Sequence, residues 1–215
     1  MLLACWSAKG GSGTTVVSVA LALLEARLAP AGALLVDLAG DVPAALGLPD
    51  EPSDGVAAWL AAGPTVPPDA LHRLEVPGGE HLALLPRGGE PLEPARADAL
   101  AALLAADDRP VVVDCGALRE EVAVTVAAAA TRSLLVTRPC YLALRRALAA
   151  PIRPSEVVLL SEPGRALGRT DVEQCLGVPV TAEVAVDPAV ARAVDAGVLA
   201  LRLPRRLARE LGRAA

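Results

Sequence analysis

Aromatic residues are nearly absent from this chain of 215 residues: they make up 1% of it, and phenylalanine does not occur. Apolar residues nevertheless account for 53% of the sequence, so leucine, valine and alanine must fill the hydrophobic core. A chain of this length can bury a substantial core. We therefore expect one globular α/β domain over residues 1–215.

Lysine is also scarce, because Lys9 is the only one and every other basic residue apart from histidine is an arginine. The net charge of −5 argues against a general affinity for nucleic acid, although it allows a local arginine patch. No uncharged apolar stretch approaches the roughly 20 residues that a membrane-spanning helix needs, and no secretion signal precedes the first apolar run. These absences favour a cytoplasmic protein with at most peripheral membrane contact.

Cysteines with the spacing of a metal site are missing as well. Cys5, Cys115, Cys140 and Cys175 are scattered singly, which is typical of small buried residues in a reducing compartment. The chain also contains no His-Glu-x-x-His pattern and no Gly-x-Ser-x-Gly elbow. The sequence therefore predicts neither a zinc site nor a serine hydrolase.

What the chain does contain is a glycine-rich turn close to Met1. The apolar run 2–6 leads into the turn, and residues 16–28 leave it with helical periodicity, which is the context of a phosphate-binding loop. Glycines let successive backbone N–H groups converge on phosphate, and the helix N-terminus adds its positive dipole. A hydroxyl in the position of Thr15 is placed to bind Mg²⁺. The candidate nucleotide-binding residues are Lys9, Gly10, Gly11, Ser12, Gly13, Thr14 and Thr15. The alternative is a glycine-rich turn that binds nothing.

This stretch resembles the deviant phosphate loop of the ParA/MinD ATPase family, whose pattern is Lys-Gly-Gly-x-Gly-Lys-Thr. Lys9 matches the first lysine, which in that family reaches across a dimer interface to the partner's nucleotide. The resemblance therefore implies a homodimer in which Lys9 is a catalytic residue for the other protomer. Thr14 stands in place of the second lysine. The TadZ/CpaE branch, which positions pilus machinery, also tends to lack that lysine and is the nearest likeness.

Two acids follow buried strands and are candidates for the metal site. Asp37 ends the apolar run that begins at Ala33, and Asp114 follows three valines. In open α/β sheets, the carboxyl ends of the strands form the ligand edge. By resemblance, Asp114 is the Walker B acid, which holds Mg²⁺ through water, and Asp37 is a second acid near the ion. The alternative for such an acid is to cap the next helix.

The resemblance also implies weak turnover. Ala39 replaces the second acid of the family's switch segment, which orients the attacking water, so we expect slow or absent hydrolysis. Asp41 is the first candidate to compensate for it. Ser161 stands near the place where the family often has an asparagine that touches the base, which leaves the base specificity open.

The rest of the chain alternates strands with helical segments. The expected strands cover residues 2–6, 33–38, 81–86, 111–116, 133–137 and 157–160, and residues 184–197 resemble the family's closing loop and helix. Two leucines and no aromatic residue in 204–215 favour a final packing helix over a membrane-surface helix. The predicted fold is a mostly parallel α/β sheet flanked by helices, a three-layer architecture like that of P-loop NTPases of the SIMIBI type.

Taken with the resemblance, the sequence predicts an ATP-binding positioning protein that uses Mg²⁺. Nucleotide would control its dimerisation and so its binding to a protein partner in pilus assembly, septum placement or chromosome partition. One alternative is a degenerate scaffold that keeps the fold without turnover. The other is a partition ATPase that rides on DNA, which requires an arginine patch on the dimer face.

Overall fold

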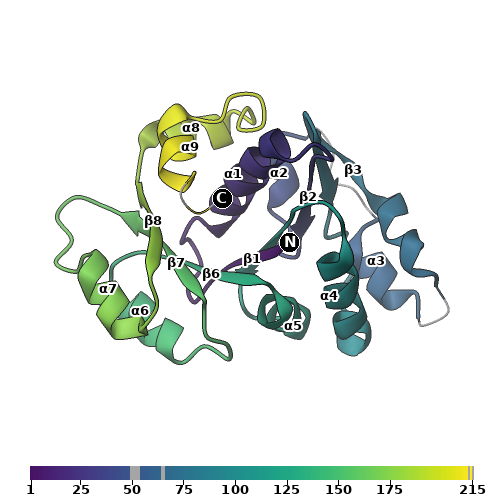
Figure 1. Cartoon of the computed structure of the whole chain (residues 1–215), viewed down its shortest axis with the longest axis horizontal. Helices are drawn as coiled ribbons and strands as arrows, with labels where there is room; N and C mark the ends of the chain where they lie inside the picture. Colours follow the sequence, from purple (N-terminus) through teal and green to yellow (C-terminus); the bar gives the residue numbers. More distant parts are fainter. Residues whose placement is uncertain (49–53, 64–65, 213, 215) are drawn as a thin grey trace.

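A computed structural model describes residues 1–48, 54–63, 66–212 and 214 of the chain (Figure 1). Its sheet contains the strands β1 (Leu2–Ser7), β2 (Ala33–Asp37), β3 (Val76–Gly79), β4 (Leu82–Leu85), β5 (Val111–Ala117), β6 (Arg132–Thr137), β7 (Glu156–Ser161) and β8 (Val180–Ala185). Their order is β3-β4-β2-β5-β1-β6-β7-β8, and every neighbouring pair is parallel except β3 with β4. The mostly parallel sheet expected from the sequence is therefore confirmed.

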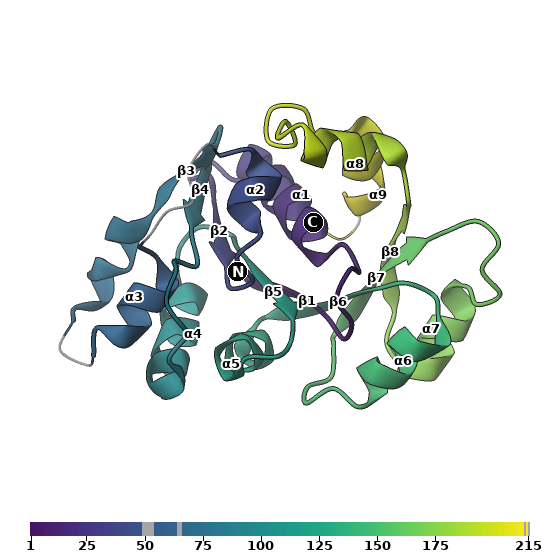
Figure 2. The same ribbon diagram turned by 180° about the vertical axis from the view of Figure 1, so that it is seen from behind.

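Helices cover both faces of the sheet. They are α1 (Thr14–Leu28), α2 (Val42–Leu46), α3 (Val56–Ala61), α4 (Ala97–Ala106), α5 (Glu121–Ala129), α6 (Tyr141–Leu148), α7 (Arg169–Leu176), α8 (Pro188–Asp195) and α9 (Arg205–Leu211). Single 3₁₀ turns occupy Pro68–Ala70, His72–Leu74 and Pro94–Arg96. Helices α1, α2, α8 and α9 lie on one face, and α3 to α7 lie on the other, which Figure 2 shows from behind. The result is the three-layer architecture.

The central strand β1 shows why the sheet needs helices on both sides. Successive side chains of a strand point to opposite faces. Leu2, Ala4 and Trp6 belong to the core under α3 to α7, whereas Leu3 and Cys5 belong to the core under α1. All five are fully buried, as expected for a parallel strand inside a sheet. Because both faces of β1 are buried in this way, the strand lies in the middle of the sheet, and the glycine-rich loop begins where it ends, after Ser7.

The sequence does not predict two of these strands correctly. β3 is a four-residue antiparallel edge strand that contains Pro77 and two glycines, a composition that strands normally avoid. β8 buries Val180, Ala182 and Val184 and leaves the residues between them more exposed. The expected loop-and-helix segment includes the last two residues of β8, but in the structure it begins only after Ala185 and continues into α8.

The C-terminal segment packs on the core, as the sequence predicts. Leu207 and Leu211 of α9 are buried beside α1 and β8. The predicted helix extends to Ala215, but α9 ends at Leu211, and residues 213 and 215 lie outside the described part. No helix among the described residues is both long and apolar enough to cross a membrane.

The expectation that all four cysteines are buried is only half right. Cys5 and Cys115 are buried, and burial raises the pKa of the Cys5 thiol to about 12 and that of Cys115 well above its usual value. Cys140, in the turn before α6, is partly exposed, and Cys175, on α7, is exposed. None of the four forms a disulfide.

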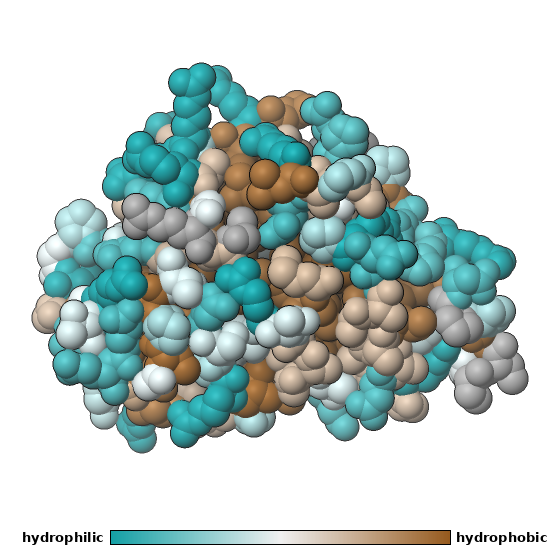
Figure 3. Space-filling view, viewed as in Figure 1, coloured by the Kyte–Doolittle hydropathy of each residue, from teal (hydrophilic) through white to brown (hydrophobic). Residues whose placement is uncertain are grey.

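The visible surface is mixed. On the face shown in Figure 3, hydrophilic side chains surround smaller apolar areas. The large apolar side chains that stay exposed are scattered over several elements: Met1, Leu28, Tyr141, Leu142, Leu148, Val186 and Leu201.

Candidate functional site

The glycine-rich loop connects β1 to α1 at the carboxyl edge of the sheet. The Ser12 hydroxyl donates a hydrogen bond to the carbonyl oxygen of Lys9 at 2.7 Å, which closes the loop on itself. The first helical hydrogen bond runs from the N–H of Val17 to the carbonyl oxygen of Gly13 at 3.1 Å. The N-terminal N–H groups of α1 therefore have no partner within the helix and lie beside the loop.

Glycine is required at one position of this loop in particular. Gly13 precedes α1 with φ +79°, in the left-handed region that other residues enter only with strain. A Cβ at this position would also lie 2.9 Å from Cδ2 of Leu160, closer than real Cβ contacts occur. Gly11 has φ +75° but open space around it. The backbone is thus bare and sharply curved where it faces the hollow.

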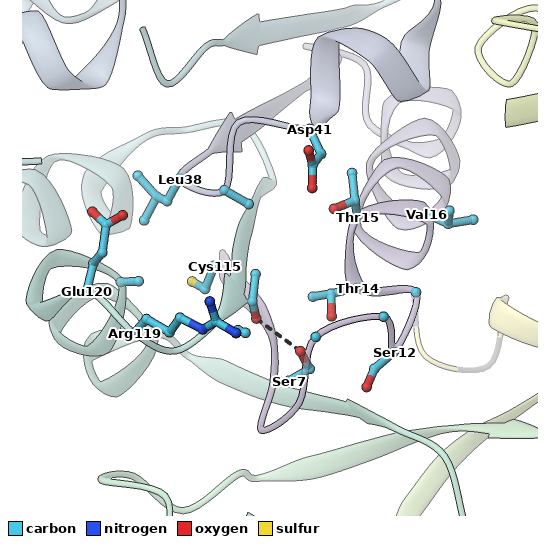
Figure 4. Close-up of a pocket in the computed structure, with 17 residues that line it drawn as sticks. Ser7, Ser12, Thr14, Thr15, Val16, Leu38, Asp41, Cys115, Arg119 and Glu120 are labelled. Carbon is cyan, nitrogen blue, oxygen red and sulfur yellow. Dashed lines mark hydrogen bonds between the residues drawn. The ribbon is translucent and has the colours of Figure 1, made fainter. Parts of the chain in front are cut away.

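A hollow of about 510 Å³ opens beside the loop. This volume lies within the usual range of small-molecule sites, roughly 300–1,000 Å³. Three segments at the carboxyl edge of the sheet form its walls: the loop itself, the turn after β2 and the segment after β5 (Figure 4). Its lining residues include Gly10, Gly13, Thr14, Thr15, Asp41 and Arg119. The hollow therefore lies where ligands bind in open α/β sheets.

Asp114 lies behind the hollow: it does not line it, but the next residues, Cys115 and Gly116, do. The Asp114 side chain is 0% exposed; Oδ1 accepts the N–H of Gly116 at 3.1 Å, but Oδ2 has no hydrogen-bond partner among the described residues. Burial raises the pKa of Asp114 to about 6, the hydroxyl of Thr15 opposes this rise, and the charge of Asp37 adds to it. A buried carboxylate in this condition fits a divalent cation or its water ligand. Thr15 and Asp114 are therefore suited to Mg²⁺.

Asp37 is already engaged by the backbone. Its Oδ1 accepts the N–H groups of Ala39 at 2.9 Å and Gly40 at 2.7 Å, and its Oδ2 accepts that of Val42 at 3.1 Å. Burial still raises the pKa of Asp37, against the effect of these three bonds. Asp37 does not line the hollow, and its role as a magnesium ligand through water stays a prediction.

What Asp37 does in this structure is to shape the turn after β2. The turn ends at Asp41, the residue before α2, whose carboxylate lies in the hollow opposite the Thr15 hydroxyl (Figure 4). Ala39 also lines the hollow but offers no polar group. Asp41 is thus the acid of this segment that faces the site.

The structure separates Lys9 from its own loop pocket. Lys9 is exposed and lines a neighbouring hollow of about 330 Å³, together with Arg119 and Arg146, but not the larger one. It makes no ion pair with any described residue. Thr14 lines the larger hollow with a short side chain, and the residue is 6% exposed. The cross-dimer role of Lys9 stays a prediction.

Sequence reasoning missed Arg119, whose side chain borders both hollows. Its one sequence signal is its place shortly after the acid of β5, since the segment that follows such a strand lies on the ligand edge. Ser161, in contrast, ends β7 without lining the larger hollow, and its carbonyl oxygen accepts the N–H of Val186 at 3.0 Å. Arg119 thus lines the hollow, and Ser161 does not.

A second group of polar side chains lies apart from the hollow. His72, Glu75 and Asp107 bring possible metal-ligating atoms within 4.8 Å of one another. The guanidinium of Arg109 donates hydrogen bonds to both carboxylates at 2.8 to 3.0 Å, and His72 Nδ1 lies 2.8 Å from Glu75 Oε1. Arg109 thus already engages both acids, and the group is an ion-pair cluster.

Comparison with known proteins identifies the fold. No protein-family model matches the chain, and no curated protein matches it. Among solved structures, a ParA family ATPase from Chlorobium tepidum TLS superposes with a TM-score of 0.80 and 22% identity, over 97% of this chain and 94% of that one. The septum site-determining protein MinD from Pyrococcus horikoshii OT3, complexed with Mg-ADP, gives 0.79 and 18% over 98% and 92%. An ATP complex of a variant of Cyanothece McdA gives 0.70 and 16% over 98% and 94%. The chain therefore has the fold of ParA- and MinD-type ATPases, and the expected likeness at the level of the fold is confirmed.

Proposed function

We propose that this chain binds Mg-ATP at the glycine-rich loop and acts as a nucleotide-controlled positioning protein. The observation that carries the proposal is the pairing of two features at one place. A bare backbone cradle opens at Gly13, and the unpartnered Oδ2 of buried Asp114 lies close by, near the Thr15 hydroxyl. The first feature suits phosphate and the second suits the cation that accompanies it.

Each residue of the site has a distinct task in this proposal. The loop N–H groups from Gly10 to Thr15 and the N-terminus of α1 bind the phosphates. The Thr15 hydroxyl binds Mg²⁺, and Asp114 holds a water ligand of the ion. Bound Mg²⁺ neutralises phosphate charge. Support comes from solved structures of the same fold, which include an Mg-ADP complex and an ATP complex.

Nucleotide-controlled pairing of two chains belongs to the same proposal. Lys9 is exposed and has no ion-pair partner among the described residues. It lines the smaller neighbouring hollow and not the one proposed to bind phosphate in its own chain. In a two-fold dimer each chain both gives and receives such a lysine. Its ammonium would stabilise the pair only when the partner's pocket contains phosphate. The paired form would then present a surface to a protein partner, such as a component of pilus assembly or cell division.

We further propose that hydrolysis is slow or absent. Ala39 has no group that can orient water, and a Cβ at Gly116 would lie only 3.0 Å from the Ala39 Cβ, so the two turns approach closely here. Asp37 has both oxygens engaged by backbone N–H groups. Of the acids in the turn after β2, Asp41 lines the hollow and can position a water molecule.

A partition ATPase that rides on DNA is the second candidate, and one observation favours it. A hollow of about 790 Å³ between α8 and α9 is lined by Arg192, Arg202 and Arg205. No ion pair involves these arginines among the described residues. Binding to duplex DNA that weakens steeply with salt would support this candidate, provided that Arg202→Ala and Arg205→Ala weaken the binding and make its salt dependence shallower. A scaffold that keeps the fold but binds no nucleotide is the third.

Calorimetry with Mg-ATP tests the binding proposal. We expect the wild-type chain to bind and Gly13→Arg to lose most of the affinity, because a side chain at this left-handed position strains the loop and meets Leu160. Gly177→Arg is the matched control, because Gly177 also has a left-handed φ of +71° but open space around it and lies at the end of α7, outside the hollow. Identical heats for the wild type and Gly13→Arg would contradict the proposal. A wild-type chain that releases no heat and retains no nucleotide would favour the scaffold.

A further inference from the structure

We propose that Arg119 supplies the phosphate-binding cation that the loop lacks at Thr14. Its guanidinium would bind the phosphate groups of a nucleoside triphosphate or diphosphate in the same chain. The inference rests on the proposed nucleotide binding and adds one residue to it. The segment after β5 would then hold the nucleotide from the wall opposite α1.

The position of Arg119 brings its charge to the start of the loop. A Cβ built at Gly10 would lie 4.0 Å from Nη2 of Arg119, so the guanidinium lies just beyond the space that such a Cβ would fill. Arg119 lines the hollow that Gly10, Gly13 and Thr14 also line. Figure 4 shows the side chain pointing from the segment after β5 toward the start of the loop near Ser7.

The backbone that carries Arg119 is anchored on the loop side. The N–H of Leu118 donates to the carbonyl oxygen of Ser7, the last residue of β1, at 3.3 Å. The Ser7 hydroxyl donates in turn to the carbonyl oxygen of Gly116 at 3.4 Å. Leu118 packs against the hydrophobic core, and α5 begins at Glu121. The arginine is therefore held between two fixed points, close to the loop.

The charge of Arg119 is available to a ligand. Arg119 is exposed and makes no hydrogen bond or ion pair through its side chain with any described residue. The neighbouring acid, Glu120, is engaged by Arg87, with 3.2 Å between Oε1 and Nη2. Arg87 also donates to the carbonyl oxygen of Leu38 at 2.9 Å, which holds it in that place. Many other arginines of the chain are paired with acids: Arg73, Arg109, Arg132, Arg138, Arg165, Arg169 and Arg206.

The chemistry of the side chain fits this role. A guanidinium presents a planar set of N–H donors that match phosphate oxygens in pairs. The threonine at position 14 offers one hydroxyl and no charge. A cation on this wall can thus replace a lysine of the helix, and the Arg119 side chain points toward the loop (Figure 4).

Titration calorimetry with Mg-ATP, Mg-ADP and adenosine tests this inference. We expect Arg119→Ala to weaken Mg-ATP binding by about ten- to a hundredfold, the effect of losing a charge-assisted hydrogen bond. Binding of adenosine should change less than about twofold, because it carries no phosphate. Thr14→Lys added to Arg119→Ala should restore most of the affinity by returning a cation to the loop.

Arg27→Ala is the matched control. It removes one exposed positive charge at the far end of α1, a helix of 15 residues and therefore roughly 20 Å long. We expect its affinity to equal that of the wild type. The melting temperature of Arg119→Ala should also stay unchanged, since the side chain has no partner among the described residues to lose. If alanine at this position impairs folding, Arg119→Gln removes the charge with less change in shape.

The outcomes separate this inference from the function on which it rests. If the wild type binds Mg-ATP and both Arg119→Ala and Arg119→Gln bind it equally well, the role of Arg119 is overturned while the nucleotide site stands. If Arg119→Ala weakens adenosine as much as Mg-ATP, the arginine does not act through phosphate and the inference is again overturned. If the wild type binds no nucleotide, the proposed function itself fails.

Discussion

Replacing Asp114 with asparagine should stabilise the protein in the absence of metal. Burial is the main reason why the pKa of this carboxyl rises from 3.8 to about 6. Above about pH 6 the native state must therefore carry a charge that the interior disfavours, while the unfolded chain carries it in water. Asp114→Asn keeps the acceptor for the Gly116 N–H and removes the charge. The wild-type residue is thus held at a cost that its proposed partner, Mg²⁺, would offset.

The magnitude follows from the pKa difference. One pKa unit corresponds to about 1.4 kcal/mol, so a rise of about 2 costs the wild type roughly 3 kcal/mol at about pH 8. The cost falls to about 1 kcal/mol at about pH 4.5, because the native carboxyl is then protonated and the unfolded one is partly so. The new amide needs an acceptor for its N–H groups, which takes back about 1 kcal/mol. A net gain of about 2 kcal/mol at about pH 8 should raise the melting temperature by roughly 4–8 °C in a chain of this size.

Thermal unfolding of both proteins in chelator-treated buffer at the two pH values is the assay. Comparing the variant with the wild type at each pH cancels the effects of the carboxylates that do not interact with Asp114, and Asp37 and Asp41 are the ones that do. Addition of Mg-ATP should then stabilise the wild type and do less for Asp114→Asn. A variant that is less stable than the wild type at about pH 8 would refute the reasoning. A stability difference that is the same at both pH values would refute it as well.

The remaining predictions concern turnover and the last helix. Phosphate release from Mg-ATP should be slow in the wild type and faster in the double variant Thr14→Lys, Ala39→Asp, which returns the lysine and the acid that the chain lacks. A wild-type rate of about 1 s⁻¹ would show that another residue orients the attacking water. A loss of that rate in Asp41→Asn would identify Asp41 as this residue. Leu207→Ala should lower the free energy of unfolding by about 2–4 kcal/mol, measured by urea denaturation, because this residue of α9 is 2% exposed. A loss below about 0.5 kcal/mol would mean that α9 is not docked in solution.

The order of the main elements could be predicted from the sequence because burial leaves a strong signal there. Parallel strands inside a sheet are apolar along their whole length, as at 111–113, and the glycine-rich turn marks where the first strand gives way to a helix. Edge strands have no such signal. β3 contains proline and glycine, and β8 mixes buried and exposed residues, so neither is distinguished locally from a loop.

The places of the candidate site residues could be predicted only where a residue type and its position in the chain agree. Thr15 could be placed because it comes directly after a glycine-rich loop, at the start of a helix. Asp114 could be placed because it comes directly after an apolar strand segment. The structure brings the two residues together. Asp37 shows the limit of this reasoning, because whether an acid at a strand end faces a ligand or its own backbone depends on the following turn. Arg119 shows it too, since its approach to Gly10 depends on how two distant turns pack.

Sedimentation of the purified chain with and without Mg-ATP tests the central claim most directly. We predict a monomer without nucleotide and a dimer with Mg-ATP for the wild type. Lys9→Ala should keep the fold and remain largely monomeric in both conditions, because the cation that reaches the partner's phosphates is gone. Arg27→Ala, at the far end of α1, should behave as the wild type. A dimer that forms equally well without nucleotide and survives Lys9→Ala would contradict nucleotide-controlled pairing and point to a scaffold instead.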